Sequence, residues 1–236
     1  MSKGLGITIE EARALVSDAA LWPRVRDFLW NFAPQVHESW LEELEWRKAL
    51  DESLGGSESC AELLMSTPRV RRFVLSSLGV EPCFHTFHKD DWSRLLLLDG
   101  AMLESIAKWI GALAASGALR RVTGGAAVRG LKESLPGVYP EVFGYTEYFR
   151  KLKVEVVELK PEETTAESIV EIGRSLLFSL VEHLPAQMLN RLRLKFPKAP
   201  SARESSGFKL PGFDFQPSNL QLLLKLRFPE AYSLCC

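Results

Sequence analysis

Apolar side chains recur every three or four residues along most of the chain, which is the spacing of a helix with one buried face. The clearest run covers residues 95–113 and includes Leu95, Met102, Ile106 and Leu113. Glycines and prolines divide the pattern into short pieces, so we expect several helices joined by tight turns. The sequence therefore predicts a mainly α protein, a compact multi-helix domain with at most a short strand pair.

Local signals predict where several helices begin and end. Thr67 and Pro68 predict an N-cap and a first-turn proline for a helix that runs through Leu78 and ends at Gly79. Further helices are expected from about residue 101 and over residues 126–135, 167–183 and 185–196. Small residues between positions 111 and 117 predict that another helix approaches closely there.

Two segments differ from this helical pattern. Residues 153–159 read KVEVVEL, whose nearly alternating apolar positions predict a strand. Residues 198–217 are rich in Ser, Gly and Pro and predict a loop. We therefore expect a helical domain over residues 1–197. Residues 198–236 would form a linker and a short helix that either pack on this domain or become ordered by a partner.

Composition narrows the class of protein. A chain of 236 residues with 46% hydrophobic and 25% charged residues can bury one sizeable core. A net charge of −1 argues against a nucleic-acid partner. The sequence shows neither the unbroken apolar run of a membrane span nor the apolar core of a signal peptide, and its four scattered cysteines fit a reducing compartment. We expect a cytoplasmic protein without direct membrane insertion.

Charge is distributed unevenly along the chain. Residues 1–66 hold twelve acidic and six basic side chains, an excess of six negative charges. Residues 188–236 hold eight basic and three acidic side chains, an excess of five positive charges. Either the two ends steer different partners, or they pair with each other in the fold. The sequence leaves both possibilities open.

One cluster has the residue types of a metal site, namely Cys83, His85 and His88 followed by Asp90 and Asp91. A zinc site needs a fourth ligand and outer partners, which the sequence does not supply, so we favour packing of a loop. The chain also lacks a phosphate-binding loop, a nucleophile elbow and the paired-histidine motif of zinc proteases. We predict no catalytic residue, no cofactor and no metal.

Trp40 and Trp46 lie among Glu42, Glu43 and Glu45. Most tryptophans of the chain lie at helical spacing among aliphatic residues and are expected in the core. These two are the best candidates for partial exposure, and Trp is enriched where proteins bind each other. We therefore select Trp40 and Trp46 as candidate partner-binding residues.

Residues 95–125, LLLLDGAMLESIAKWIGALAASGALRRVTGG, resemble the core of the SctK/YscK/OrgA/MxiK family of bacterial type III secretion systems. The shared features are a leucine-rich LDG turn, a helix that carries a tryptophan and a glycine-rich step. Residues 184–196, LPAQMLNRLRLKF, are similar to the basic, leucine-rich C-terminal helix of the family. Residues 201–236 are longer than the family pattern, which leaves their role open.

The resemblance implies a non-enzymatic adaptor of the cytoplasmic sorting platform beneath the injectisome. Such a protein links the cytoplasmic domain of the inner-membrane ring protein (SctD-like) to the pod protein (SctQ-like), and through it indirectly to the ATPase complex. It is recruited to the cytoplasmic face of the inner membrane by the secretion apparatus.

On this interpretation we expect basic side chains near the C-terminus to line one interface. They are Arg191, Arg193, Lys195, Lys225 and Arg227. One alternative is a helical secretion chaperone or regulator that binds effectors in a groove, although such chaperones are usually smaller, acidic and dimeric. A cryptic metal-dependent enzyme is a less favoured alternative.

Overall fold

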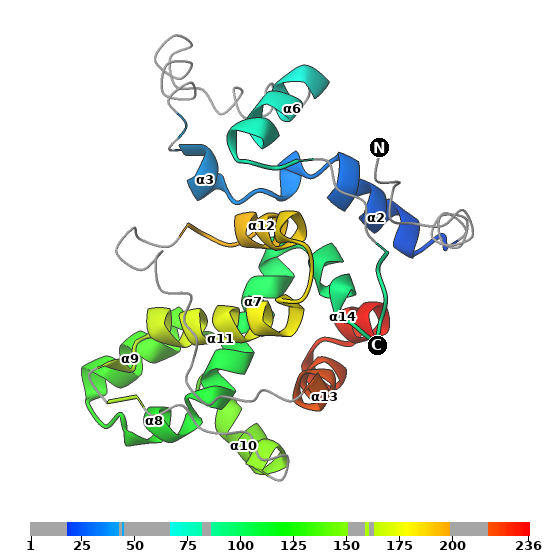
Figure 1. Ribbon diagram of the computed structural model, residues 1–236. Helices are drawn as coiled ribbons and strands as arrows, with labels where there is room; N and C mark the ends of the chain where they lie inside the picture. Colours follow the sequence, from blue (N-terminus) through cyan, green and yellow to red (C-terminus); the bar gives the residue numbers. More distant parts are fainter. Residues whose placement is uncertain are drawn as a thin grey trace. The chain divides into compact units, whose positions relative to one another are not determined.

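The computed structural model describes residues 18–42, 44, 67–81, 86–150, 159–160, 163–198 and 217–236. Within these residues the chain forms helices joined by turns and contains no strand (Figure 1). The predicted mainly α fold is therefore confirmed. The candidate strand lies almost wholly outside the described residues, and so does Trp46.

Contacts divide the chain into two compact units. Unit 1 consists of residues 1–100 and 184–200, and unit 2 consists of residues 101–183 and 201–236. This division differs from the boundary that we expected after residue 197, because residues 184–200 return to the first hundred residues of the chain. Each unit is described separately below.

Unit 1 is built from short helices. They are α2 (Leu21–Trp30), η1 (Ala33–Gln35), α3 (Glu38–Glu42), α6 (Pro68–Ser77), η2 (Ser93–Leu97) and α12 (Ala186–Leu194). Helices α2 and α12 both pack against η2, and α6 packs against η1. Phe28 makes edge-to-face contacts with Phe32 and Phe87, and these rings form an aromatic centre of the core.

The helix ends of unit 1 follow from local chemistry. The Asp18 carboxylate accepts hydrogen bonds from the backbone N–H groups of Ala20 (3.1 Å) and Leu21 (2.9 Å), which satisfies donors that the first turn of α2 leaves unpaired. Helix α6 has Pro68 in its first turn, as predicted. Gly79 follows its C-terminus at φ 66°, a left-handed conformation that favours glycine.

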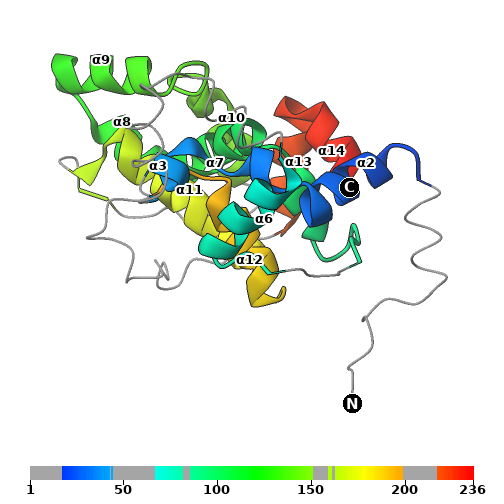
Figure 2. The same cartoon turned by 90° about the horizontal axis from the view of Figure 1, so that it is seen from above.

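Unit 2 is built around two longer helices, α7 and α11. Its helices are α7 (Gly100–Ala114, whose first residue belongs to unit 1), α8 (Ser116–Arg121), α9 (Gly125–Ser134), α10 (Val142–Arg150), α11 (Ala166–Val181), α13 (Pro217–Arg227) and α14 (Pro229–Cys235). A capping box begins α11, because Thr165 and Ser168 each accept a backbone N–H of the other through their hydroxyls. Figures 1 and 2 show α9 on the opposite side of α7 from α13 and α14.

Helices α7 and α11 cross at two glycines. A Cβ atom on Gly111 would lie 1.9 Å from the carbonyl oxygen of Ile169, and one on Gly173 would lie 1.8 Å from the carbonyl oxygen of Ala107. Backbone therefore meets backbone at this crossing, which leaves no room for any side chain. The close approach that the small residues of α7 predicted is confirmed.

The last helices of unit 2 are held by Arg227. Its guanidinium lies 4.3 Å from the centre of the Trp109 ring and donates hydrogen bonds to the Glu141 carboxylate (2.9 Å) and the Tyr145 hydroxyl (3.3 Å). These contacts connect α13 to α7 and to the start of α10. Across the part of the chain that is described, no helix combines the length and the apolar character that crossing a membrane requires.

Candidate functional site

Helix α12 organises the site because it presents cations on two different faces. Arg191 and Lys195 are four residues apart and therefore share one face of the helix, whereas Arg193 lies between them on another face. Arg191 and Lys195 are each only 2% exposed, while Arg193 is exposed. Large cations are almost never fully buried without partners.

The partners of Arg191 are backbone carbonyl groups. One guanidinium nitrogen donates to the carbonyl oxygens of Phe28 and Leu29, and another donates to that of Glu81 at 2.9 Å. Phe28 and Leu29 lie in the last turn of α2, where carbonyls have no partner within the helix and carry the negative end of its dipole. Arg191 therefore caps the C-terminus of α2 from a distant part of the chain.

Lys195 caps the C-terminal end of η2 in the same way. Its Nζ donates to the carbonyl oxygens of Leu96 and Leu98, both at 2.6 Å, where η2 ends. Desolvation by burial lowers the pKa of this amine to about 7, and the positive charges of Arg24 and Arg191 add to the lowering against the opposing charge of Asp99. An unprotonated amine still has two N–H groups, one for each carbonyl.

These contacts correct the expectation that Arg191 and Lys195 line an interface. Both side chains lie inside unit 1, because the ends of α2 and η2 offer carbonyl acceptors that a cation on the inner face of α12 can reach. Their function in this structure is to join α12 to α2 and η2.

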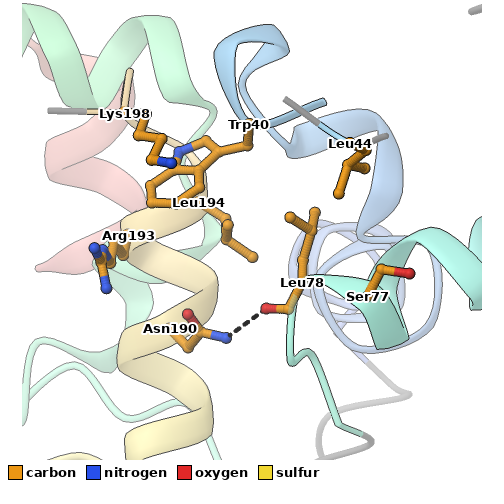
Figure 3. A pocket seen from close by; sticks show the side chains of 8 residues that line it. All are labelled: Trp40, Leu44, Ser77, Leu78, Asn190, Arg193, Leu194 and Lys198. Atoms are coloured by element: carbon orange, nitrogen blue, oxygen red, sulfur yellow. Dashed lines mark hydrogen bonds between the residues drawn. The ribbon is translucent and has the colours of Figure 1, made fainter. Parts of the chain in front are cut away.

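The outer face of α12 forms one side of an open groove of about 340 Å³ (Figure 3). Helices α3 and α6 contribute the other sides. The lining residues are Trp40, Leu44, Ser77, Leu78, Asn190, Arg193, Leu194 and Lys198. All of them belong to unit 1.

Hydrogen bonds fix the α3 side of the groove to the end of α12. The backbone N–H of His37 donates to the carbonyl oxygen of Leu194 at 2.8 Å, and the backbone N–H of Lys198 donates to the Ser39 hydroxyl at 2.9 Å. The indole N–H of Trp40 donates to the carbonyl oxygen of Phe196 at 2.8 Å. Trp40 is thereby held in one orientation along the groove.

The α6 side is fixed in a similar way. The Asn190 amide donates to the carbonyl oxygens of Leu78 (3.3 Å) and Gly79 (3.2 Å), directly after α6 (Figure 3 shows the first bond). One turn earlier on α12, the Gln187 amide donates to the Glu81 carboxylate at 3.2 Å. Both sides of the groove are therefore attached to α12.

The groove is lined by cationic, polar and aliphatic side chains. The Arg193 guanidinium lies 5.1 Å from the centre of the Trp40 ring, and the Lys198 Nζ lies 5.5 Å from it. Both distances are within the range of cation–π attraction. Leu44 and Leu78 supply apolar surface beside them, and Leu194 is buried beneath. The eight lining residues include no carboxylate, imidazole or thiol.

The structure thus brings together Trp40 and Arg193, which were predicted separately as partner-binding residues. Lys225 is exposed on α13, and Arg227 is packed on Trp109, both in unit 2. A role in partner binding stays a prediction for Trp40, Trp46, Arg193, Lys225 and Arg227.

The sequence prediction missed six residues of the groove, which are Leu44, Ser77, Leu78, Asn190, Leu194 and Lys198. Lys198 follows Pro197 at the edge of the segment that we expected to be a loop, so no helical pattern connected it with Arg193. Asn190 is an amide residue among the mostly apolar and basic residues of α12. This difference was the available signal for its role, which is to donate a hydrogen bond to the backbone carbonyl of Leu78.

The candidate metal cluster is only partly described. Cys83 and His85 lie outside the described residues, and His88 is exposed with its Nε2 atom 2.8 Å from the Thr86 hydroxyl. In the portions of the chain that the structure describes, no group of three or more His, Cys, Asp or Glu side chains is arranged to hold a metal ion.

A comparison with protein families gives a match over most of the chain. The family model described as YOP proteins translocation protein K (YscK) matches residues 26–235. This range includes both sides of the groove, the two buried cations of α12 and the crossing of α7 with α11. No curated protein and no solved structure matches the chain.

Proposed function

The chain belongs to the YscK family of type III secretion proteins, and from this membership we propose that it is a non-enzymatic adaptor of the secretion apparatus. The observation that carries the proposal is the family match over residues 26–235, which is nearly the whole chain. The composition of the groove supports it, because the lining offers aromatic, aliphatic and cationic contact surface without a pair of acid–base groups.

The adaptor links two partners. One is the cytoplasmic domain of the inner-membrane ring protein (SctD-like), and the other is the pod protein (SctQ-like), which connects to the ATPase complex. Through the first partner the chain is recruited to the cytoplasmic face of the inner membrane. A protein that bridges two partners needs two separate surfaces, and we assign one of them to the groove of unit 1.

A capture experiment tests the proposal. The ring-protein cytoplasmic domain is immobilised, the pod protein is added with or without this chain, and the captured pod protein is quantified. We expect capture only when the chain is present. The adaptor function is rejected if the chain binds neither partner, or if it retains a secretion effector in place of them, as a chaperone would.

A further inference from the structure

We propose that the outward face of helix α6 binds an acidic surface of a partner protein. This face consists of Arg69, Arg72, Phe73 and Ser76, all of which are exposed. The inference rests on the proposed adaptor function, which requires protein partners, and it specifies one surface and the chemistry that the partner must offer.

Packing on unit 1 fixes the direction in which this face points. Its four residues are spaced three and four positions apart, so they share one side of the helix. On the other side Val74 is only 2% exposed, and Arg71 donates a hydrogen bond to the side chain of Asn31 after α2. Asn190 donates to the carbonyl groups at the C-terminal end of α6. The helix is therefore held by its inner side and its end, and the outward face is left to solvent.

The charges of α6 run against the preference of a helix. Acidic residues suit the first turn, where the helix dipole is positive, but α6 has Arg69 there and contains no acidic residue. Arg72 is three positions further along the same face, so the two like charges also repel each other. In the part of the chain that the structure describes, neither Arg69 nor Arg72 pairs with a carboxylate. Carboxylates of a partner would offset both unfavourable terms, and this selects an acidic occupant.

Phe73 adds an aromatic contact beside the two arginines. It is 56% exposed although it also interacts within the chain, so more than half of its surface can meet a partner. Arginine and aromatic residues are the types enriched where proteins bind each other, and arginine binds carboxylates through paired N–H groups. We therefore expect a partner surface on which carboxylates flank an apolar side chain that packs on the Phe73 ring.

The composition of the face disfavours a membrane or a nucleic acid. A helix that lies in a membrane surface needs a broad apolar side as well as cations, and Phe73 is the one large apolar residue among the four. Nucleic-acid binding uses many cations, whereas the whole chain has a net charge of −1. Two arginines and one ring match a small acidic patch on a protein.

Affinity measurements with the separate partners test the inference. The full chain is titrated over the immobilised ring-protein cytoplasmic domain and, in a second series, over the immobilised pod protein. We expect Arg69→Glu, Arg72→Glu to weaken binding to one of them by about tenfold or more and to leave the other unchanged. Phe73→Ala should weaken the same partner. Added salt should weaken binding of the wild type more than binding of the double variant.

A matched control makes the same change of charge at the same spacing. Arg129→Glu, Lys132→Glu reverses two exposed cations three residues apart on α9 and should leave both affinities unchanged. Thermal melting supplies a second measurement. Arg69→Glu should melt no earlier than the wild type, because an acid in the first turn suits the helix dipole. Weaker binding without a lower melting temperature assigns Arg69 to the interface and not to folding.

The inference is overturned if both partners bind the double variant as well as the wild type, or if the α9 control weakens the same partner equally. It is also overturned if the double variant instead loses binding to phosphatidylglycerol vesicles or loses self-association, since the occupant is then a membrane or a second copy. In these outcomes the adaptor function stands as long as the wild type binds both partners. If the wild type binds neither, the adaptor function fails and this inference fails with it.

Discussion

At the scale of single residues, the position of a cation on α12 decides what it does. Arg191 and Lys195 donate to carbonyls at the ends of α2 and η2, and Arg193 stacks on Trp40 at the surface. Hydrogen bonds offset the cost of burying a cation, and the last turns of α2 and η2 supply carbonyl acceptors that have no partner within their helices. Side chains of similar chemistry thus serve the fold on one face and the groove on another.

Exchanging arginine for lysine at two neighbouring positions separates these functions. Arg191→Lys should lower the free energy of unfolding by roughly 2–4 kcal/mol, because a single ammonium cannot reach the carbonyls of Phe28, Leu29 and Glu81 together. Arg193→Lys makes the same chemical change on an exposed side chain and should alter the free energy of unfolding by less than about 0.5 kcal/mol. Urea denaturation measures both variants, and equal effects would show that Arg191 is not a structural cap.

The lowered pKa of Lys195 predicts how the free energy of unfolding depends on pH. The unfolded chain keeps this proton up to a pKa near the ordinary 10.5, whereas the folded chain releases it near pH 7 because burial desolvates the charge. Between these values the unfolded state binds more protons, so the free energy of unfolding rises with pH. The rise due to this residue is at most about 1.4 kcal/mol per pH unit.

The variant Lys195→Met isolates this contribution. Groups that titrate elsewhere affect wild type and variant alike, so the difference between their unfolding free energies should grow in favour of wild type as the pH is raised above 7. Urea denaturation at several pH values measures that difference. A difference independent of pH would mean that Lys195 keeps its proton in the folded chain.

The residues of the groove could be predicted only in part. Trp40 and Arg193 follow from their neighbours in the sequence, because an aromatic residue among acids and a cation on an amphipathic helix both indicate exposure. The burial of Lys195 could not be predicted, since it depends on carbonyls of Leu96 and Leu98 almost a hundred residues away. Side-chain type alone does not reveal such acceptors.

At the scale of elements, the crossing of α7 and α11 fixes the core of unit 2. The glycine and alanine residues of α7 predicted a close neighbour, but the pattern did not identify Gly173 as the residue that meets it. Periodicity reports that a helix face is buried and leaves its partner unspecified. The ends of α6 were predicted more closely, because Pro68 and Gly79 act on the backbone locally.

Replacing single glycines with alanine tests this crossing. Gly111→Ala should destabilise the protein by roughly 3 kcal/mol or more, because its Cβ would overlap the carbonyl oxygen of Ile169. Gly130→Ala on α9 meets no atom within 4 Å and should stabilise the protein by about 0.5–1 kcal/mol through its better helix propensity. Thermal unfolding compares the two, and a Gly111→Ala protein as stable as wild type would refute the crossing.

At the scale of the whole molecule, the mainly α fold followed from helical periodicity, whereas the two units did not follow from the sequence. Sequence signals predict domains as continuous segments of the chain. Unit 1, however, combines residues 1–100 with residues 184–200, and most of unit 2 lies between them in the sequence. This return of the chain places α12 beside α3 and α6 and so creates the groove. The family match covers both units, which is why we treat the complete chain as the functional adaptor.

The central claim is that one copy of this chain holds two different proteins at once. Light scattering during size-exclusion chromatography measures it directly, on a mixture of the chain, the ring-protein cytoplasmic domain and the pod protein. We expect one peak whose molar mass requires all three proteins, and separate elution of the two partners when the chain is left out. If the partners elute together without the chain, or displace each other from it, the chain is not a bridge between them.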